Sequence, residues 1–473
     1  MLYINGEWIK TEDKMDVFNP ATGELIESVS TGGKEYAKQA IQDAKEAFKT
    51  WKKLTAKERG SYLAKAAEIM KSKADQLAET ITKENGKPLP DAKGEVASGI
   101  EHLEWYAEEA KRVYGDTVPA SSPDRQLLVI KQPIGVCGAI TPWNFPLSMI
   151  TRKIAPAIAA GCTVVLKPAP DTPLSAIHVF ECFHEAGLPK GVINLVIGPA
   201  EEIGHELTSS SDVRKISFTG STMVGKKLLK DSADTVKKVS MELGGHAPYI
   251  VFDDADLDLA VDGILASKFK NAGQTCISTN RIYVHENVAD EFSEKLAAKV
   301  SKLSVGNGIE DNVDVGPVIT QAAISKVKNH VEDAVKNNGK VLTGGKVHAK
   351  SEAGGNFFEP TVIANANESM LIASEETFGP VAPIFTFKDE EEIVEKANHP
   401  TYGLAAYCFT SNLGRSMRMM QELEFGIVGI NDTSPGGVQA PFGGVKESGI
   451  GKEGGQYGIR EYLEEKAVSI RLV

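Results

Sequence analysis

One cysteine of the chain lies in a setting that is typical of a nucleophile rather than of a core residue. Cys276 ends the segment 269–276, FKNAGQTC, which is polar and contains a glycine. Most lone cysteines are small buried hydrophobes, whereas a polar turn favours an accessible thiolate, the form that attacks carbon. Upstream, Glu242 ends an apolar run just before Gly244 and Gly245. A single acid in that place is typical of a general base at a strand end.

Two glycine-rich segments could contact the phosphates of a nucleotide. Residues 449–454 have the spacing GxGxxG, but no apolar strand leads into them and only 19 residues follow. A dinucleotide-binding βαβ unit does not fit there, so we predict a flexible loop. Residues 220–227 resemble a P-loop without the hydroxyl residue after its lysine, which counts against an ATPase. They begin a helix, so phosphate contact and a simple turn both stay open.

Clustered acids and histidines are the other residues that could bind a ligand. Residues 253–258, DDADLD, lack the glycine and the late glutamate of a calcium loop. Acids at the start of a helix are stabilised by its dipole, and this is our interpretation of the segment. The nine histidines show no metal-binding spacing. We therefore predict no metal site.

The elements that must position these residues alternate between strands and helices. Short β-branched runs predict strands at 163–166, 192–197 and 215–219, with helices between and after them at 173–186, 200–209 and 221–231. This rhythm favours a doubly wound parallel sheet. The strand ends of such a sheet face the ligand crevice.

The rest of the chain adds a hairpin, three helices and a second β/α stretch. We predict the hairpin at 2–9 and helices at 34–51, 56–84 and 91–114, from apolar residues that recur every three or four positions. The second stretch has strands at 249–252 and 282–285 and a helix that opens at Asp256. The chain ends in an alternating strand at 467–473. An exposed final strand usually pairs, so we expect an oligomer.

Composition excludes several classes of protein. The 473 residues carry 52 Lys and Arg against 64 Asp and Glu, a net charge of −12, which argues against a nucleic-acid binder. The five cysteines form no CxxC pair, which is typical of a reducing compartment. The chain opens without a leader pattern and contains no long apolar run, so we expect a cytoplasmic protein that does not contact membranes.

Seven short motifs resemble those of one known family. They are TPWNFP at 141–146, KPA at 167–169, FTGS at 218–221, ELGG at 242–245, GQTC at 273–276, EETFGP at 375–380 and PFGG at 441–444. In this order they resemble the NAD(P)-dependent aldehyde dehydrogenase superfamily, over essentially the whole chain. The resemblance implies an α/β fold with a Rossmann-like parallel-sheet cofactor domain, an α/β catalytic domain and a small β oligomerisation arm. This cofactor fold does not need GxGxxG.

The resemblance implies three catalytic residues. Cys276 looks like the nucleophile, which forms a thiohemiacetal and then a thioester with the aldehyde carbon. Asn144 is similar to the side chain that donates to the oxyanion, together with the backbone N–H of Cys276. Glu242 resembles the base that activates water for hydrolysis of the thioester. A base for water argues against coenzyme A as the acyl acceptor.

The resemblance also implies a binding site for NAD or NADP. Lys167 resembles a ligand of the adenosine ribose and Glu376 a ligand of the nicotinamide ribose. The other implied cofactor residues are Thr141, Trp143, Gly220, Ser221 and Phe378. Three residues after Lys167, relatives that prefer NAD often have a glutamate, but this chain has Pro170. Without that carboxylate a 2′-phosphate is not repelled, so both cofactors stay open.

The branch that the chain resembles most is succinate-semialdehyde dehydrogenase. Arg152, in the stretch MITRK, is similar to the arginine that meets the substrate carboxylate there. A second arginine of that branch corresponds to Lys270, which weakens bidentate recognition. Lactaldehyde, glycolaldehyde, sulfolactaldehyde or a broad range of aldehydes are the alternative substrates. A catalytically silent structural or binding protein on the same scaffold is the alternative outside enzymes.

The family pattern implies three units. The cofactor domain would comprise residues 1–118 and 137–243, and the catalytic domain residues 244–438. Residues 119–136 and 457–473 would form the oligomerisation arm of a homodimer or homotetramer.

Overall fold

An eight-stranded sheet forms one half of the molecule, and its central strands are parallel. The computed structural model describes residues 1–399 and 401–472. In spatial order the strands are β2 (Glu7–Ile9), β1 (Leu2–Ile4), β9 (Ile193–Leu195), β8 (Thr163–Lys167), β7 (Val136–Ile140), β10 (Val213–Thr219), β11 (Lys238–Glu242) and β21 (Gly449–Ile450). β8 has the sequence TVVLK and is buried along its length, as a strand covered on both faces must be.

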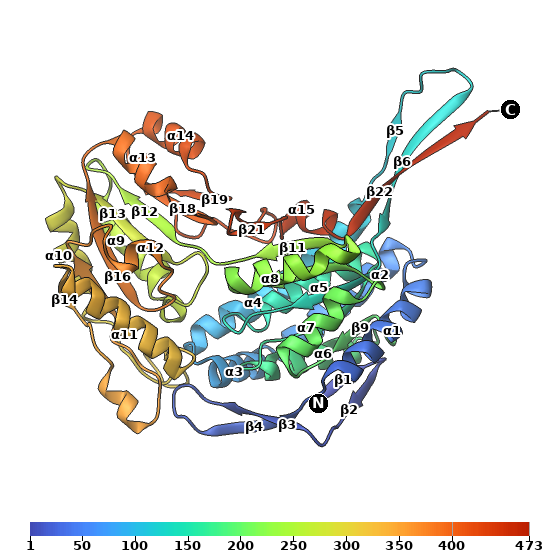
Figure 1. Cartoon of the computed structure of the whole chain (residues 1–473), viewed down its shortest axis with the longest axis horizontal. Helices are drawn as coiled ribbons and strands as arrows, with labels where there is room; N and C mark the ends of the chain where they lie inside the picture. The colour runs from blue at the N-terminus through green and yellow to red at the C-terminus, as the bar shows by residue number, and fades with distance from the viewer. Residues whose placement is uncertain (400, 473) are drawn as a thin grey trace.

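Helices cover both faces of this sheet (Figure 1). They are α1 (Lys34–Trp51), α2 (Ala56–Ser72), α3 (Ala74–Asn85), α4 (Leu89–Glu109), α5 (Ser148–Ala160), α6 (Pro173–Glu185), α7 (Ala200–Ser209) and α8 (Thr222–Ser232). The single helix predicted at 56–84 is wrong in one respect. Lys73 has φ −109° and ψ 11°, so it ends α2 and precedes α3.

A seven-stranded sheet with a separate hydrophobic core forms the other half. Its strands, in spatial order, are β14 (Lys340–Thr343), β15 (Thr361–Ala364), β16 (Val381–Phe387), β13 (Thr279–His285), β12 (Ala247–Val251), β18 (Ala405–Phe409) and β19 (Ile427–Ile430). Its helices are α9 (Leu257–Lys268), α10 (Ala289–Val300), α11 (Gln321–Lys336), α12 (Leu371–Ser374), α13 (Glu390–Asn398) and α14 (Leu413–Glu422). The predicted α/β class is therefore confirmed.

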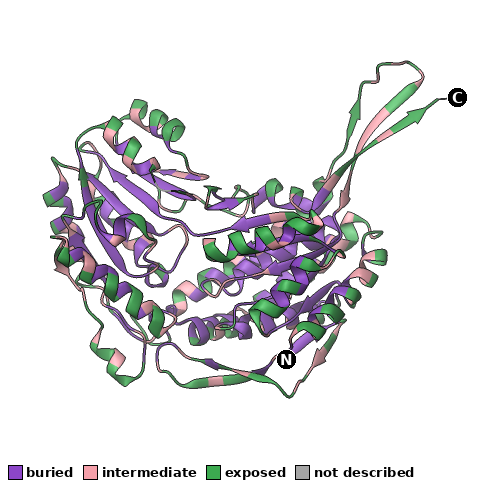
Figure 2. Cartoon of the chain, viewed as in Figure 1, coloured by how far each residue is buried: buried purple, intermediate pink, exposed green. Residues whose placement is uncertain are grey.

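A three-stranded arm extends away from both halves (Figure 1). It consists of β5 (Asp116–Val118), β6 (Arg125–Pro133) and β22 (Leu463–Arg471). The final strand begins earlier than the predicted residue 467, and Val473 lies outside the described residues. Most of the arm is exposed or half-buried, in contrast to the buried sheets (Figure 2).

Short elements complete the described chain. They are the strand pairs β3 (Lys14–Phe18) with β4 (Leu25–Ser30) and β17 (Tyr402–Gly403) with β20 (Val445–Lys446), helix α15 (Gly455–Arg460), and the 3-10 turns η1 (Ala110–Arg112), η2 (Ala233–Thr235), η3 (Lys270–Gly273) and η4 (Ala349–Ala353). Within the described ranges, no helix combines the length and apolar character that crossing a bilayer requires.

The GxGxxG segment is not the flexible loop predicted from its sequence. Its first two residues form β21, which pairs antiparallel with β11 so that Gly449 lies opposite Glu242. Its fifth residue, Glu453, is buried and ion-paired with Lys153 at 2.6 Å. The backbone pairing and this buried ion pair hold the segment against the first sheet.

The other two ambiguous motifs have structural roles. Ser221 caps α8 by accepting a hydrogen bond from the backbone N–H of Val224 at 3.4 Å. Lys226, the lysine of the P-loop-like stretch, pairs at the surface with Glu447 at 2.7 Å. Asp256 caps α9, and Asp254 pairs with Arg415 at 2.8 Å. The interpretation of the acidic run as a helix start is therefore confirmed.

Candidate active site

Two cavities meet at Cys276, on the boundary between the two halves of the molecule. The first, which we name the Arg152 cavity, has a volume of about 340 Å³ and is lined by Arg152, Lys270, Tyr407, Phe442 and Cys276 among others. The second, the Trp143 cavity, has a volume of about 480 Å³. Its lining includes Trp143, Asn144, Gly220, Ser221, Glu376, Phe378 and again Cys276. A thiol at such a junction can meet one ligand from each side.

A strained turn presents Cys276 to both cavities. Asn271 and Ala272 have φ of 48° and 54°, which non-glycine residues seldom adopt, and Gly273 follows with φ 75°. A Cβ on Gly273 would lie 2.3 Å from the carbonyl oxygen of Gly379. Gly245 also lets the backbone approach closely, because a Cβ there would lie 2.2 Å from the Cys276 carbonyl oxygen. Gly245 and Gly273 therefore leave the space that neighbouring backbone atoms occupy near the nucleophile.

The Cys276 side chain is partly exposed, as the polar turn predicts, but it is not a thiolate in the ligand-free chain. Burial raises the pKa of its thiol to about 12, and the nearby carboxyl groups of Glu376 and Glu242 add to the shift. The thiol therefore keeps its proton near neutral pH, and a base must remove it before sulfur can attack.

Glu242 ends β11, and its carboxyl group is buried without a hydrogen-bond partner among the described residues. Burial and the neighbouring Glu453 raise its pKa well above the usual value. The cations Lys153, Lys452 and Arg152 act in the opposite direction. A partly desolvated carboxyl group without a fixed partner is suited to accept a proton from water.

Lys153 and Glu453 form a buried ion pair that acts on the pKa of Glu242, and sequence reasoning missed both. Burial raises the pKa of Glu453, but Lys153 and Arg152 outweigh burial and hold it below its usual value. The sequence feature that could have indicated this ion pair is the position of Lys153. It lies one residue after Arg152 in the otherwise apolar helix 148–160, where an unpaired ammonium is costly.

The two predicted substrate cations line the same cavity. The Arg152 guanidinium lies 4.5 Å from the centre of the Phe442 ring, and its Nε and Nη1 are buried without a hydrogen-bond partner within the described ranges. Its Nε is 3.9 Å from Glu453. Lys270 is exposed at the cavity edge. The carboxylates of Asp91 and Glu95 also line this cavity.

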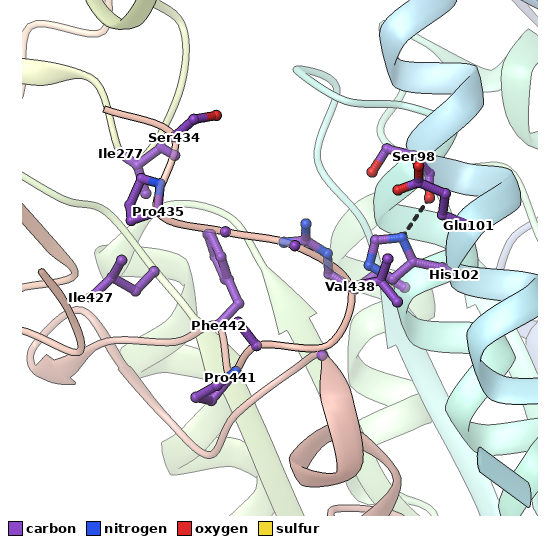
Figure 3. Close-up of a pocket in the computed structure, with 15 residues that line it drawn as sticks. Ser98, Glu101, His102, Ile277, Ile427, Ser434, Pro435, Val438, Pro441 and Phe442 are labelled. Carbon is purple, nitrogen blue, oxygen red and sulfur yellow. Dashed lines mark hydrogen bonds between the residues drawn. The ribbon is translucent and has the colours of Figure 1, made fainter. Parts of the chain in front are cut away.

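A third cavity of about 210 Å³ adjoins the Arg152 cavity and shares Arg152 and Phe442 with it. In Figure 3 the segment that carries Ser434, Pro435 and Phe442 faces His102 of α4 across this space. The His102 ring is bonded to the Ser98 carbonyl oxygen at 2.7 Å, and burial lowers its pKa to about 4. This histidine is therefore neutral near pH 7.

Five of the predicted cofactor residues line the Trp143 cavity. Trp143 and Phe378 meet edge to face with ring centres 5.6 Å apart. Burial raises the pKa of Glu376 to about 7, and its Oε1 accepts a hydrogen bond from Gly245 N at 3.1 Å. Gly220 and Ser221 lie at the N-terminus of α8.

Thr141 and Lys167 are not among the residues that line this cavity. The Thr141 backbone N–H donates to the Lys167 carbonyl oxygen at 3.1 Å, and Pro142 and Trp143, which follow Thr141, do line the cavity. Burial lowers the pKa of Lys167 to about 8. Sequence reasoning missed two residues that do line the cavity, Asp171 and Lys326. Lys326 donates to the Glu376 carbonyl oxygen at 2.5 Å.

Asn144 lines the Trp143 cavity beside Cys276. Its Nδ2 donates to the Gln274 carbonyl oxygen at 3.0 Å, and its Oδ1 has no partner among the described residues. Cys276 and Asn144 therefore line one cavity from different elements, whereas Glu242 is not among the residues that line it and lies near enough to raise the pKa of Cys276. Their arrangement can support attack by sulfur, stabilisation of an oxyanion and activation of water.

Comparisons with known proteins agree with this geometry. The family described as "Aldehyde dehydrogenase family" matches residues 8–468. Over 470 residues the chain is 52% identical to a glutarate-semialdehyde dehydrogenase of Pseudomonas putida, which covers 99% of this chain and 97% of that protein. It is 51% identical over 471 residues to an Escherichia coli succinate-semialdehyde dehydrogenase (NADP+), again covering 99% and 97%. The crystal structure of an E. coli NADP dependent enzyme superposes with a TM-score of 0.98 at 50% identity, covering 100% of this chain and 98% of that one.

Proposed function

Because the chain belongs to the aldehyde dehydrogenase family, we propose that it oxidises a short aldehyde with an anionic far end to the carboxylic acid. The observation that carries this proposal is the position of Cys276 between two cavities. The first is lined by the cations Arg152 and Lys270 and by two carboxylates, Asp91 and Glu95, of which Glu95 is neutralised by Lys87. An aldehyde carbon can reach the sulfur from the first while a hydride acceptor lies in the second.

Succinate semialdehyde is the substrate that we propose first, and glutarate semialdehyde is its longer analogue. Arg152 supports this choice because its Nε and Nη1 are buried without a hydrogen-bond partner among the described residues, and Glu453, at 3.9 Å from Nε, is too far to supply one. A substrate carboxylate would supply that hydrogen bond. Lys270 adds a second positive charge. The two similar enzymes named above act on these two semialdehydes. Sulfolactaldehyde, with a sulfonate in place of the carboxylate, fits the same charges.

The Trp143 cavity fits NAD or NADP. Glu376 offers a carboxylate to ribose hydroxyls, Gly220 and Ser221 lie where a helix N-terminus favours phosphate, and the Trp143 and Phe378 rings form an apolar wall. A Cβ on Gly244 would lie 3.0 Å from Glu376 Oε2, so glycine keeps this space open. We propose that Lys167 and Thr141 support the adenosine ribose. The bound nicotinamide supplies a carbon that accepts hydride.

The proposed chemistry begins at Cys276. Once its proton passes to solvent water, Sγ bonds to the aldehyde carbon, and the carbonyl π electrons move to oxygen. The resulting oxyanion accepts hydrogen bonds from Asn144 Nδ2 and the Cys276 backbone N–H. The C–H bond then breaks, its hydride leaves toward the Trp143 cavity, and a thioester remains on Cys276. Glu242 takes a proton from water, whose oxygen attacks the thioester carbonyl carbon. The C–S bond breaks and releases the acid and the Cys276 thiolate.

A panel of aldehydes assayed with NAD and with NADP tests this proposal. We expect reduced cofactor, followed at 340 nm, with the highest kcat/KM for succinate or glutarate semialdehyde and a lower value for a neutral aldehyde of the same length. No reduced cofactor with any aldehyde would favour a silent binding protein. A preference for lactaldehyde, glycolaldehyde or the neutral aldehyde would contradict the anionic pocket.

We also propose that the chain forms a homo-oligomer through its arm. Along the arm, Ile130, Ile470 and Leu472 are more than two-fifths exposed. β5 and β22 leave unpaired edges on the three-stranded sheet. Exposed apolar strands of this kind usually pair with another chain.

A further inference from the structure

The ammonium of Lys87 is one of the most completely buried charges of the chain, and the steps proposed above leave it without a role. Its side chain is 1% exposed. Nζ donates to Glu95 Oε2 at 2.6 Å and to the backbone carbonyl oxygen of Asn144 at 2.8 Å. It also lies 4.1 Å from the centre of the Phe145 ring. A buried ammonium with so few partners is costly and needs a compensating contribution.

Both bonds of the ammonium lead to the segment that carries Asn144. The Asn144 carbonyl oxygen accepts a second bond, from Asn271 Nδ2, at 3.0 Å. Asn271 belongs to the strained turn that presents Cys276. The carbonyl oxygen of Asn144, the proposed oxyanion donor, therefore accepts hydrogen bonds both from the Lys87 ammonium and from the turn that presents Cys276.

Glu95 holds the other end of the same segment. Its Oε1 accepts hydrogen bonds from the backbone N–H groups of Leu147 at 2.9 Å and Ser148 at 3.2 Å, where α5 begins. The Lys87–Glu95 pair thus forms hydrogen bonds with both ends of the segment 144–148. Asn85, two residues before Lys87, donates from Nδ2 to the Trp143 carbonyl oxygen at 3.1 Å.

We propose that Lys87, with Glu95, is a positioning residue that sets the backbone of Asn144 so that its side-chain amide faces the oxyanion formed on Cys276. The inference rests on the proposed function. It differs from a purely structural role in one respect, because Lys87 acts on the rate only through Asn144. Holding the carbonyl oxygen of Asn144 restrains its ψ angle and so the direction of its Cα–Cβ bond. A donor displaced by about 1 Å loses much of its value.

A double-mutant cycle between Lys87 and Asn144 tests this inference. Asn144→Ala removes the donor and should lower kcat by about 100- to 1000-fold. Lys87→Met should lower kcat by about 10- to 100-fold, with KM and the Kd for NAD or NADP, measured by fluorescence titration, changed by less than about threefold. The double variant should be no slower than Asn144→Ala alone, because the donor that Lys87 places is already absent.

Lys215 supplies the matched control. Its ammonium is equally buried, donates to Ser240 and pairs with Glu461 at 3.6 Å, as Lys87 pairs with Glu95. None of these three residues lines either cavity. Lys215→Met therefore reports the general cost of removing a buried ammonium, and any loss of kcat should multiply with that of Asn144→Ala. If Lys87→Met does not fold, Glu95→Gln replaces it in the cycle, since it weakens the same hydrogen bonds with residues 144–148.

The outcomes separate this inference from the function on which it rests. Losses that multiply in the double variant, as in the Lys215 control, would overturn the inference while leaving aldehyde oxidation intact. An unchanged kcat in Lys87→Met would do the same. A wild-type chain that oxidises no aldehyde would overturn the proposed function, and with it the inference.

Discussion

Burial raises the pKa of Cys276 to about 12 and the pKa of Glu242 well above its usual value, which favours the protonated form of each group. Their chemistry needs both protons removed, so we expect the oxidation rate to rise with pH from neutral. Three positive groups, Lys153, Lys452 and Arg152, limit the pKa of Glu242. One negative group, Glu453, raises it.

The pH profile of a Glu453→Gln variant tests that balance. The substitution removes the charge that raises the pKa of Glu242 and leaves the Lys153 ammonium in place. We expect the acidic limb of the kcat profile to move to lower pH by about one unit. Glu447→Gln, which removes an exposed partner of Lys226, is the control and should leave the limb in place. A Glu453→Gln limb that stays put or moves to higher pH would contradict the assignment.

Arg152→Ala tests whether the cavity selects an anion. A charged hydrogen bond contributes about 1.5–3 kcal/mol, so KM for succinate semialdehyde should rise about 10- to 100-fold. Because Arg152 also lies near Glu453, kcat for every aldehyde can change. The readout is therefore the ratio of kcat/KM for succinate semialdehyde to that for butanal. An unchanged ratio would remove the argument for a carboxylate.

For single residues, the sequence indicated which side chains could take part in the chemistry, but not the burial and neighbouring charges that set their pKa values. The ordered motifs pointed to Cys276, Glu242 and Asn144. Of these, Cys276 and Asn144 line the Trp143 cavity, and Glu242 ends β11 without lining it, so their catalytic roles stay predictions. The protonation of the thiol was not predictable, because its pKa depends first on burial in the folded chain and then on Glu376 and Glu242, which are remote in sequence. Glu453 was not predicted because it lies within the segment 449–454, whose GxGxxG spacing resembles a nucleotide-binding motif.

Among the elements, the turn before Cys276 depends most on close backbone approach. Gly245 precedes β12, and a Cβ there would lie 2.2 Å from the Cys276 carbonyl oxygen. Backbone atoms cannot move aside as a flexible side chain can. The position of the nucleophile is therefore coupled to the start of the second sheet.

Gly245→Ala should displace this turn and lower kcat by about 10-fold or more, since small misplacements of reacting groups are costly. Gly204→Ala in α7 is the matched control, because the nearest atom to its added Cβ is 3.9 Å away. Its kcat should be unchanged, with unfolding stability equal or slightly higher. Steady-state kinetics and urea unfolding of both variants measure this, and an active Gly245→Ala variant would contradict the steric argument.

Periodicity located the hairpin at 2–9 and the alternating strands and helices between residues 163 and 231, because burial on one face repeats along the sequence. It failed where a single residue or a distant partner decides. Lys73 leaves helical geometry and divides the predicted helix at 56–84. The glycine-rich segment 449–454 forms an edge strand only because β11 offers a free edge. Neither segment contains a sequence pattern that indicates the break at Lys73 or the pairing of residues 449–450 with β11.

In the whole molecule, the arm exposes apolar side chains to solvent in a single chain, and an interface with a second chain would bury them. Ile130 and Ile470 are 43% and 41% exposed on neighbouring strands. Light scattering after size exclusion should give a dimer or tetramer of the 50.8 kDa chain. Ile130→Asp with Ile470→Asp should lower that mass, whereas Val335→Asp on α11 should not. A wild-type monomer at micromolar concentration would contradict the role of the arm.

The most direct test of the account is the covalent state of Cys276 during one turnover. A Glu242→Gln variant cannot activate water, so the thioester should accumulate when succinate semialdehyde and cofactor are added. We predict one equivalent of reduced cofactor per site in a burst, and peptide mass spectrometry that finds one succinyl group on Cys276. A burst without acylated Cys276, or acylation of another residue, would contradict the central claim.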